Sequence, residues 1–120
     1  ESHELEFISS GIGLHLIRNG AITSFNHGSH GLEYRFDYRG MALKMPVEDG
    51  DQFFVFTDGM YDQIGGPGQK RFMKKRLLQT ILAAHGPQLS QTVAQVEEQL
   101  AAWQENSPQI DDRMLVAFCW

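Results

Sequence analysis

The sequence lacks the features that mark several common classes of protein. Its single cysteine, Cys119, cannot form a disulfide within the chain, which fits a reducing cytosol. No apolar run reaches the roughly 18 residues that a membrane-spanning helix requires, and no signal peptide is visible. The 10 basic residues are outnumbered by 15 acidic ones, and the net charge of −5 argues against a protein that coats nucleic acid. We therefore expect a cytoplasmic segment that contacts neither nucleic acid nor membrane, whether or not its parent protein carries an anchor.

What the chain does contain is enough for one globular domain. It has 120 residues, of which 42% are hydrophobic, and this suits a single core. Charged residues make up 21%, a composition that argues against disorder. The first residue is Glu1 and not Met, so we expect the protein to continue upstream.

The first half of the chain has the patterns of β-strands. A short apolar run covers residues 5–9, and Asn19-Gly20 separates two further apolar runs. Asn-Gly at such a point predicts a hairpin, because both residues tolerate positive φ. Residues 32–39 alternate apolar and polar side chains, as a half-buried strand does. Residues 52–57, QFFVFT, are apolar on both faces and predict a strand buried between layers.

The second half is mostly helical. Apolar residues recur at helical spacing from about residue 69 to 85, and again to about residue 104 after Ser90, a candidate N-cap. The final run, DDRMLVAFCW, predicts a second buried strand. Strands, two helices and a last strand indicate an α+β fold in which the helices pack on a mainly antiparallel sheet.

Three carboxylates stand at the ends of the two apolar strands. Asp58 follows the first strand, and Asp111 and Asp112 precede the second. If the strands pair antiparallel, these carboxylates gather at one sheet edge, where they need a compensating cation. Oxygen ligands suit Mg²⁺ or Mn²⁺, and Gly59 leaves room beside Asp58 for a water or a phosphate. The alternative is a turn at Asp58-Gly59 and a cap or solvated loop at Asp111-Asp112.

At these residues the chain resembles a known family. Its stretches are similar, in order and spacing, to the C-terminal part of the metal-dependent protein phosphatase (PPM) family, in the bacterial SpoIIE-like serine phosphatase branch. The segment DGMYDQIGG is most similar to the corresponding segment of SiaA-type members. The stretches that carry the resemblance are LEFISSGIGLHLIRNGAI, EDGDQFFVFTDGMYDQIGG, KRFMKKRLLQTI, TVAQVEEQLAAW and IDDRMLVAF, which together cover nearly the whole chain.

The resemblance implies an α-β-β-α sandwich with two Mn²⁺ or Mg²⁺ ions at one end of the β layers. Asp58 matches the metal-binding Asp of the family's Asp-Gly motif, and Asp111 matches the metal-binding first residue of the terminal Asp-Asp. Gly59 and Asp112 are the neighbours that would support these ligands. The family's further ligands belong to an N-terminal segment, so we expect residues 1–120 to be the C-terminal part of a single phosphatase domain, inactive alone.

The activity that the resemblance implies is hydrolysis of phosphoserine or phosphothreonine by a two-metal mechanism. The expected substrate is a phosphorylated protein similar to an anti-sigma-factor antagonist, in bacterial partner-switching signalling. A second reading stays open, in which the chain is a non-catalytic PPM-like module that binds a protein. An upstream Asp-Gly on a strand would favour the enzyme, and its replacement would favour the module.

A basic cluster lies in the second half of the chain. Lys70, Arg71, Lys74 and Lys75, followed by Arg76, supply half of the chain's basic residues. They are candidate contacts for an acidic partner or a phosphosite, and the alternative is a solvated helix face. His27 and His30 have no third ligand near them in sequence, and we interpret both as surface residues.

Overall fold

The computed structural model describes residues 3–9, 11–25, 35–36 and 42–120, which form two compact units. Unit 1 consists of Glu1–Val55 with Phe118–Trp120, and unit 2 consists of Phe56–Ala117. His27 and His30 lie outside the described residues, as does most of the strand predicted over 32–39. Neither α-helix in the described part is long and apolar enough to cross a membrane.

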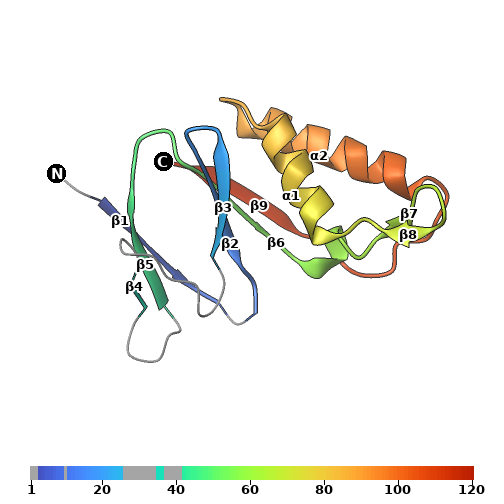
Figure 1. Cartoon of the computed structure of the whole chain (residues 1–120), viewed down its shortest axis with the longest axis horizontal. Helices are drawn as coiled ribbons and strands as arrows, with labels where there is room; N and C mark the ends of the chain where they lie inside the picture. The colour runs from blue at the N-terminus through green and yellow to red at the C-terminus, as the bar shows by residue number, and fades with distance from the viewer. Residues whose placement is uncertain (1–2, 10, 26–34, 37–41) are drawn as a thin grey trace. The chain divides into compact units, whose positions relative to one another are not determined.

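Unit 1 is built from antiparallel strands (Figure 1). One sheet has the order β1-β5-β4, with β1 at His3–Ile8, β5 at Ala42–Val47 and β4 at Arg35–Phe36. The predicted hairpin is confirmed: β2, at Leu14–Arg18, pairs antiparallel with β3, at Ala21–Phe25. The turn between them has φ of 53° at Asn19 and 76° at Gly20, the positive values that Asn-Gly accepts.

The two apolar strands that the sequence predicts are neighbours in a second sheet, of order β3-β2-β6-β9. They are β6, at Gln52–Phe56, and β9, at Leu115–Cys119. At the start of β6 the Trp120 amide donates to the Asp51 carbonyl at 2.9 Å, and beyond its end the Thr57 amide donates to the Met114 carbonyl at 3.0 Å. Residue numbers rise along one strand as they fall along the other, so the predicted antiparallel pairing is confirmed.

The predicted burial is right for β6 and wrong for β9. Four of the five residues of β6 are buried, and the strand lies inside its sheet, between β2 and β9. β9 stands at the edge of its sheet, and Val116 and Phe118 are 45% and 36% exposed. An apolar run does not distinguish a central strand from an edge strand, and here the edge position leaves apolar side chains in contact with solvent.

The core of unit 1 brings its strands together. Its fully or nearly fully buried members are Leu14, Leu16, Phe25, Leu43, Met45 and Phe53. Leu5 and Phe7 of β1 pack against this cluster, and the alternation along β1 leaves Glu4 and Glu6 exposed. At about 25 cal/mol per Å² of apolar surface, this burial is the main stabilising contribution in the unit.

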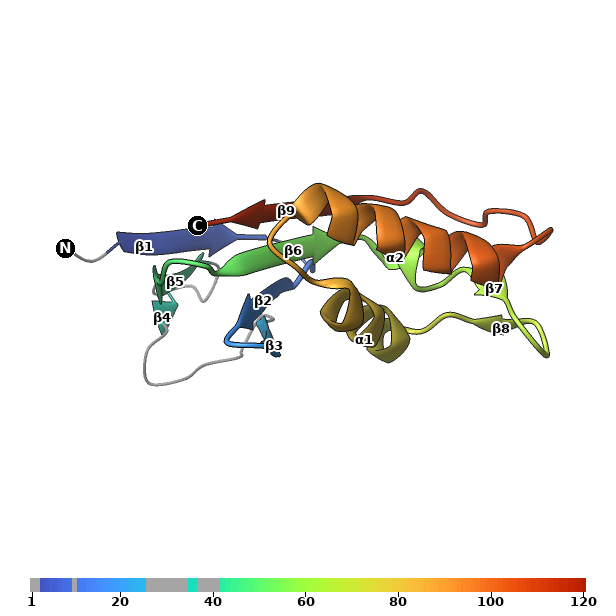
Figure 2. The same cartoon turned by 90° about the horizontal axis from the view of Figure 1, so that it is seen from above.

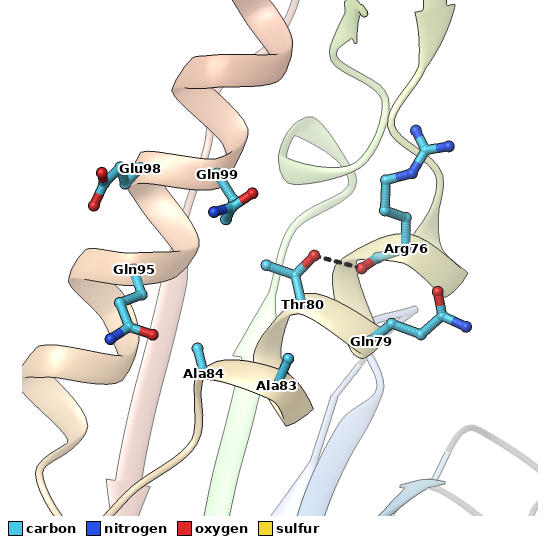
Figure 3. Close-up of a pocket in the computed structure, with 8 residues that line it drawn as sticks. All are labelled: Arg76, Gln79, Thr80, Ala83, Ala84, Gln95, Glu98 and Gln99. Carbon is cyan, nitrogen blue, oxygen red and sulfur yellow. Dashed lines mark hydrogen bonds between the residues drawn. The ribbon is translucent and has the colours of Figure 1, made fainter.

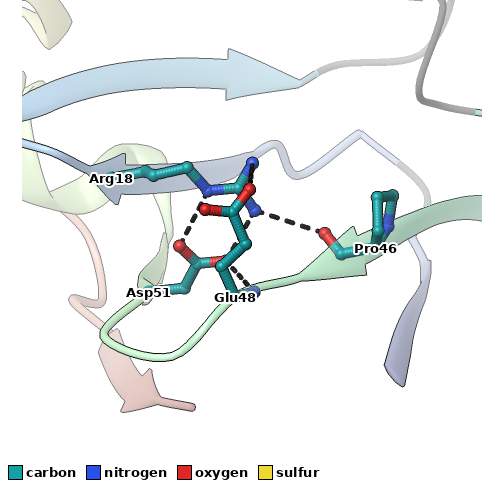
Figure 4. A network of polar contacts seen from close by, with 4 residues as sticks. All are labelled: Arg18, Pro46, Glu48 and Asp51. Carbon is teal, nitrogen blue, oxygen red and sulfur yellow. Dashed lines mark hydrogen bonds and ion pairs between the residues drawn. The ribbon is translucent and has the colours of Figure 1, made fainter. Parts of the chain in front are cut away.

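A polar network holds the turn before β6 against β2 (Figure 4). Arg18 donates to both carboxylate oxygens of Asp51, at 2.8 Å and 2.7 Å, and to the Pro46 carbonyl at 3.2 Å. The Glu48 amide donates to Asp51 at 2.9 Å. Asp51 is only 1% exposed. Burial alone would raise the pKa of Asp51, but the hydrogen bonds from Arg18 and Glu48 and the charge of Arg18 hold it below its usual value.

Unit 2 contains both helices, which lie side by side (Figures 1 and 2). They are α1, at Lys74–Ala84, and α2, at Leu89–Gln104. Buried Thr92 of α2 donates to the Ala84 carbonyl in the last turn of α1 at 3.2 Å. Ser90 is not the N-cap of α2, since that position is Gln88 and it makes no side-chain capping bond. The apolar faces of the helices supply the core of the unit through Leu77, Ile81, Val96 and Leu100.

The first helix begins five residues later than the sequence predicts. Lys70–Arg71 form strand β8, which pairs antiparallel with β7 at Ile64–Gly65. The next two amides also donate to carbonyls outside the helix. The Phe72 amide donates to the Gln63 carbonyl and the Met73 amide donates to the Tyr61 carbonyl, each at 2.8 Å. These tertiary bonds hold the segment extended, so Lys70 and Arg71 are not in the first turn of the helix.

Candidate functional site

The turn after β6 carries the first predicted site residues. Thr57 ends the strand, and Asp58–Met60 form one turn of 3₁₀ helix in which the Asp62 amide donates to the Asp58 carbonyl at 2.8 Å. Asp58 is exposed, so its oxygens are accessible to a hydrated cation. Burial, and then the charges of Asp58 and Asp62, raise the pKa of Tyr61.

The turn lies against the segment that carries the other two carboxylates. The Thr57 hydroxyl accepts from the Met114 amide at 3.0 Å and donates to the Asp112 carbonyl at 3.4 Å. A β-carbon at Gly59 would stand 1.9 Å from that same carbonyl oxygen. Gly59 is therefore required for the approach of two backbone segments, and not only for the room beside Asp58 that the sequence suggested.

The structure thus brings together the segments of Asp58, Asp111 and Asp112, as the strand pairing predicted. All three residues are exposed, and one Asp111 oxygen accepts from the Asp112 amide at 2.8 Å. Carboxylate oxygens are a donor set that fits Mg²⁺ or Mn²⁺. Within the described residues, no three His, Cys, Asp or Glu side chains form a group that could hold a metal ion. The metal-binding roles of Asp58 and Asp111 stay predictions.

A buried polar cluster that the sequence did not reveal adjoins this site. Gln63 is 0% exposed, and its side-chain amide donates to the Pro108 carbonyl at 2.9 Å. Arg113, directly after Asp111-Asp112, donates to the side-chain oxygens of Gln63 and Gln104. Burial lowers the pKa of Arg113. These glutamines come from distant parts of the chain and have no distinctive spacing, so no local pattern could have predicted the cluster.

The four predicted partner contacts occupy two elements of unit 2. Lys70 and Arg71 are exposed on β8, while Lys74 and Lys75 open α1, whose first turn has no acidic residue. Across the described part of the chain, none of the four makes an ion pair. All four are therefore cations without a carboxylate partner in this part of the chain, and the helix dipole disfavours Lys74 and Lys75 in the first turn of α1.

The hairpin β7–β8 is held by Trp103 of α2. The indole N–H donates to the carbonyls of Gln63 and Lys70, at 3.2 Å and 3.1 Å, and the Gly66 amide donates to the Trp103 carbonyl at 2.8 Å. The Arg76 guanidinium lies 4.1 Å from the centre of the indole ring. Glycine lets this hairpin pack against the aromatic ring, because a β-carbon at Gly66 would stand 2.4 Å from Trp103.

A groove of about 490 Å³ separates the exposed sides of α1 and α2 (Figure 3). Its lining is mostly polar, includes Arg76 from the end of the basic cluster, and contains none of the predicted metal ligands: Arg76, Gln79, Thr80, Ala83, Ala84, Gln95, Glu98 and Gln99. The Thr80 hydroxyl donates to the Arg76 carbonyl within α1, at 2.7 Å. The candidate site is therefore the acidic turn, and not this groove.

Comparison with known proteins gives one family and one fold. Residues 2–120 match the family described as Stage II sporulation protein E (SpoIIE). Among solved structures, the SiaA-PP2C domain of Pseudomonas aeruginosa is similar with a TM-score of 0.80 and 23% identity. The match covers 98% of this chain and 46% of that one, so the chain spans less than half the length of that structure. No curated protein matches the chain by sequence at a significant level.

The structural match confirms the predicted fold class. The two helices and antiparallel sheets correspond to part of a PP2C-type fold, and the match extends over nearly all of the chain.

Proposed function

Because the chain belongs to the SpoIIE family, whose fold here is that of a PP2C-type phosphatase domain, we propose that it is the C-terminal part of an enzyme that dephosphorylates serine or threonine on a protein partner. The observation that supports this most is the contact of the Thr57–Gly59 turn with Asp112 and Met114. Through this contact, backbone segments that carry exposed carboxylates meet from two distant parts of the sequence.

Asp58 and Asp111 would hold Mn²⁺ or Mg²⁺ through carboxylate oxygens, together with ligands from the rest of the domain. When bound, such ions lower the pKa of a water and stabilise negative charge on a phosphoryl group. The residues of this chain hold the ligand oxygens in place. Thr57 ties the two segments together through its hydroxyl, and Gly59 lets them approach.

The basic residues would bind the phosphorylated partner. Lys70 and Arg71 project from β8, and Lys74 and Lys75 from the start of α1, in a chain whose net charge is −5. Uncompensated cations of this kind attract acidic or phosphorylated segments and raise the rate of encounter. We propose a partner similar to an anti-sigma-factor antagonist, the type of substrate that partner-switching signalling requires.

The experiment is a phosphatase assay on the full-length protein with a serine-phosphorylated protein substrate, in Mn²⁺, in Mg²⁺ and in EDTA. We expect metal-dependent release of phosphate, and a loss of at least about 100-fold in kcat for Asp58→Asn, because one charged ligand is removed. The matched control is Asp49→Asn, which changes an exposed turn aspartate in unit 1. Equal activity of Asp58→Asn and the control would reject the proposed role of Asp58. A protein that binds the substrate but releases no phosphate under any metal condition would favour the non-catalytic module.

A further inference from the structure

The segment that leads to Asp111 and Asp112 has no regular structure of its own. No helix or strand covers residues 105–114, between the end of α2 and the start of β9. A segment without a helix or strand ladder depends on other partners for its backbone groups. Backbone hydrogen bonds join Glu105 and Ser107 to the end of α2 and Met114 to Thr57, at the two ends of the segment. The position of Asp111 and Asp112 therefore depends also on the side chains that bind it.

Gln63 and Gln104 hold the beginning of the segment. The Gln104 amide donates to the Ser107 carbonyl at 2.9 Å, and the Gln63 amide donates to the Pro108 carbonyl at 2.9 Å. Gln63 is itself fixed, because its backbone carbonyl accepts from Phe72 at 2.8 Å and from the Trp103 indole at 3.2 Å. It follows Asp58 by five positions, in the same turn region.

Arg113 holds the end of the segment. One of its terminal nitrogens donates to the side-chain oxygens of both Gln63 and Gln104, so the same two amides bind both ends. Its Nε is buried and has no hydrogen-bond partner among the described residues. A half-buried cation paired only with neutral amides is costly to desolvate, and a hydrophobic side chain would pack there at lower cost. Its presence next to two carboxylates indicates a role in placing them.

We propose that Gln63 and Arg113 are positioning residues that hold Asp111 and Asp112 against the Asp58 turn. The amide of Gln63 fixes the entry to the segment, and Arg113 fixes its exit through the side-chain oxygens of Gln63 and Gln104. This inference rests on the proposed function for its catalytic consequence. Its structural content, the placement of the segment, is independent of that function.

The test compares Arg113→Met, Arg113→Lys and Gln63→Leu in the full-length protein. Three quantities are measured on each folded variant: Mn²⁺ affinity by titration calorimetry, kcat and KM on a phosphorylated protein, and amide hydrogen exchange over residues 109–114. We expect Arg113→Met and Gln63→Leu to weaken Mn²⁺ binding or kcat about 10- to 100-fold, the usual effect of losing a group that orients metal ligands. KM should change little, and exchange over 109–114 should quicken while α2 stays protected.

Arg113→Lys keeps the charge and one donor, so it should recover part of both Mn²⁺ affinity and kcat. The control, Lys44→Met, removes a partly exposed cation from β5 and should leave Mn²⁺ affinity and exchange over 109–114 unchanged. Normal Mn²⁺ affinity, kcat and exchange in folded Arg113→Met would overturn the inference. Where Arg113→Met fails to fold, wild-type values of all three in Arg113→Lys and Gln63→Leu would overturn it equally.

The two proposals fail in different ways. If Asp58→Asn retains full activity, the proposed function fails, yet quickened exchange over 109–114 in the Arg113 and Gln63 variants still supports the placement of the segment. If Asp58→Asn is inactive and those variants behave as wild type in every measurement, the proposed function stands and the positioning role is rejected.

Discussion

The backbone of Gly59 lies against the carbonyl oxygen of Asp112, so closely that a β-carbon at position 59 would stand 1.9 Å from it. The oxygen belongs to the main chain and cannot swing away as a flexible side chain can. The contact therefore links the turn after β6 to the segment before β9, and any side chain at position 59 must push the two apart.

Gly59→Ala should separate these segments. We expect a loss of about 1–3 kcal/mol in the free energy of unfolding, the usual cost of overpacking, with weakened Mn²⁺ binding in the full-length protein. Chemical denaturation measures the first quantity and titration calorimetry the second. Gly86→Ala is the matched control, because an added β-carbon there meets nothing within 4 Å. Equal stability of the two variants would show that the turn accommodates a β-carbon at position 59 without loss of stability.

The pair of Arg18 and Asp51 predicts a stability change in acid. The folded-state pKa of Asp51 lies below its unfolded value of about 3.9, so the pair contributes its full stability above that value. That contribution falls as the pH drops below about 4, through the lowered folded-state pKa, because Asp51 must then take up a proton. Urea denaturation between pH 7 and pH 2 measures this loss as a decrease in the free energy of unfolding.

Asp51→Asn should remove this part of the pH dependence. It should also cost about 3–5 kcal/mol at pH 7, since it leaves the half-buried Arg18 without its bidentate partner. Asp49→Asn, which changes an exposed aspartate of the same turn, should follow the wild-type curve. An Asp51→Asn curve parallel to wild type at every pH would contradict the assignment.

The hairpin of Asn19 and Gly20 was predictable because its determinants are local: two residues that accept positive φ stand between apolar runs. The start of α1 was not predictable. The amides of Phe72 and Met73 donate to the carbonyls of Gln63 and Tyr61, and these bonds override the helical pattern of the sequence.

The candidate site divides in the same way. The sequence predicted that Asp58 and Asp111 lie on adjoining segments, because antiparallel pairing of the two apolar runs brings the end of one next to the start of the other. Arg113 and Gln63 were missed, since their contact joins residues 50 positions apart that only the folded chain brings together.

Trp103 should control the stability of the β7–β8 hairpin. Trp103→Phe keeps an aromatic ring but loses the indole N–H bonds to Gln63 and Lys70, so we expect a loss of about 1–2 kcal/mol in unfolding free energy. Trp103→Ala should cost about 3–5 kcal/mol because it also leaves a cavity. Hydrogen exchange of residues 64–71 should quicken in both variants. Unchanged exchange there would mean that the hairpin does not depend on the indole.

The basic residues predict a salt-dependent interaction. Lys70→Ala combined with Arg71→Ala should raise KM for a phosphorylated protein substrate and leave kcat unchanged, because the change removes long-range attraction and not the chemistry. The effect should shrink as ionic strength rises and screening increases. The control is Lys44→Ala, on β5, where Lys44 faces Glu6 at 3.7 Å. A KM that is independent of salt and of the double substitution would favour the alternative of a solvated surface.

The exposed face of β9 predicts self-association of the 120-residue chain. Val116 and Phe118 of β9 are 45% and 36% exposed, at alternate positions that share one side of the edge strand. Apolar side chains on an unpaired edge favour pairing with another chain, so sedimentation velocity should show oligomers that increase with concentration. Val116→Lys should shift the distribution to monomer. Ile110→Lys, at an exposed apolar residue outside the strand, should not. A wild-type chain that stays monomeric at high concentration, or equal effects of the two changes, would show that β9 does not drive association.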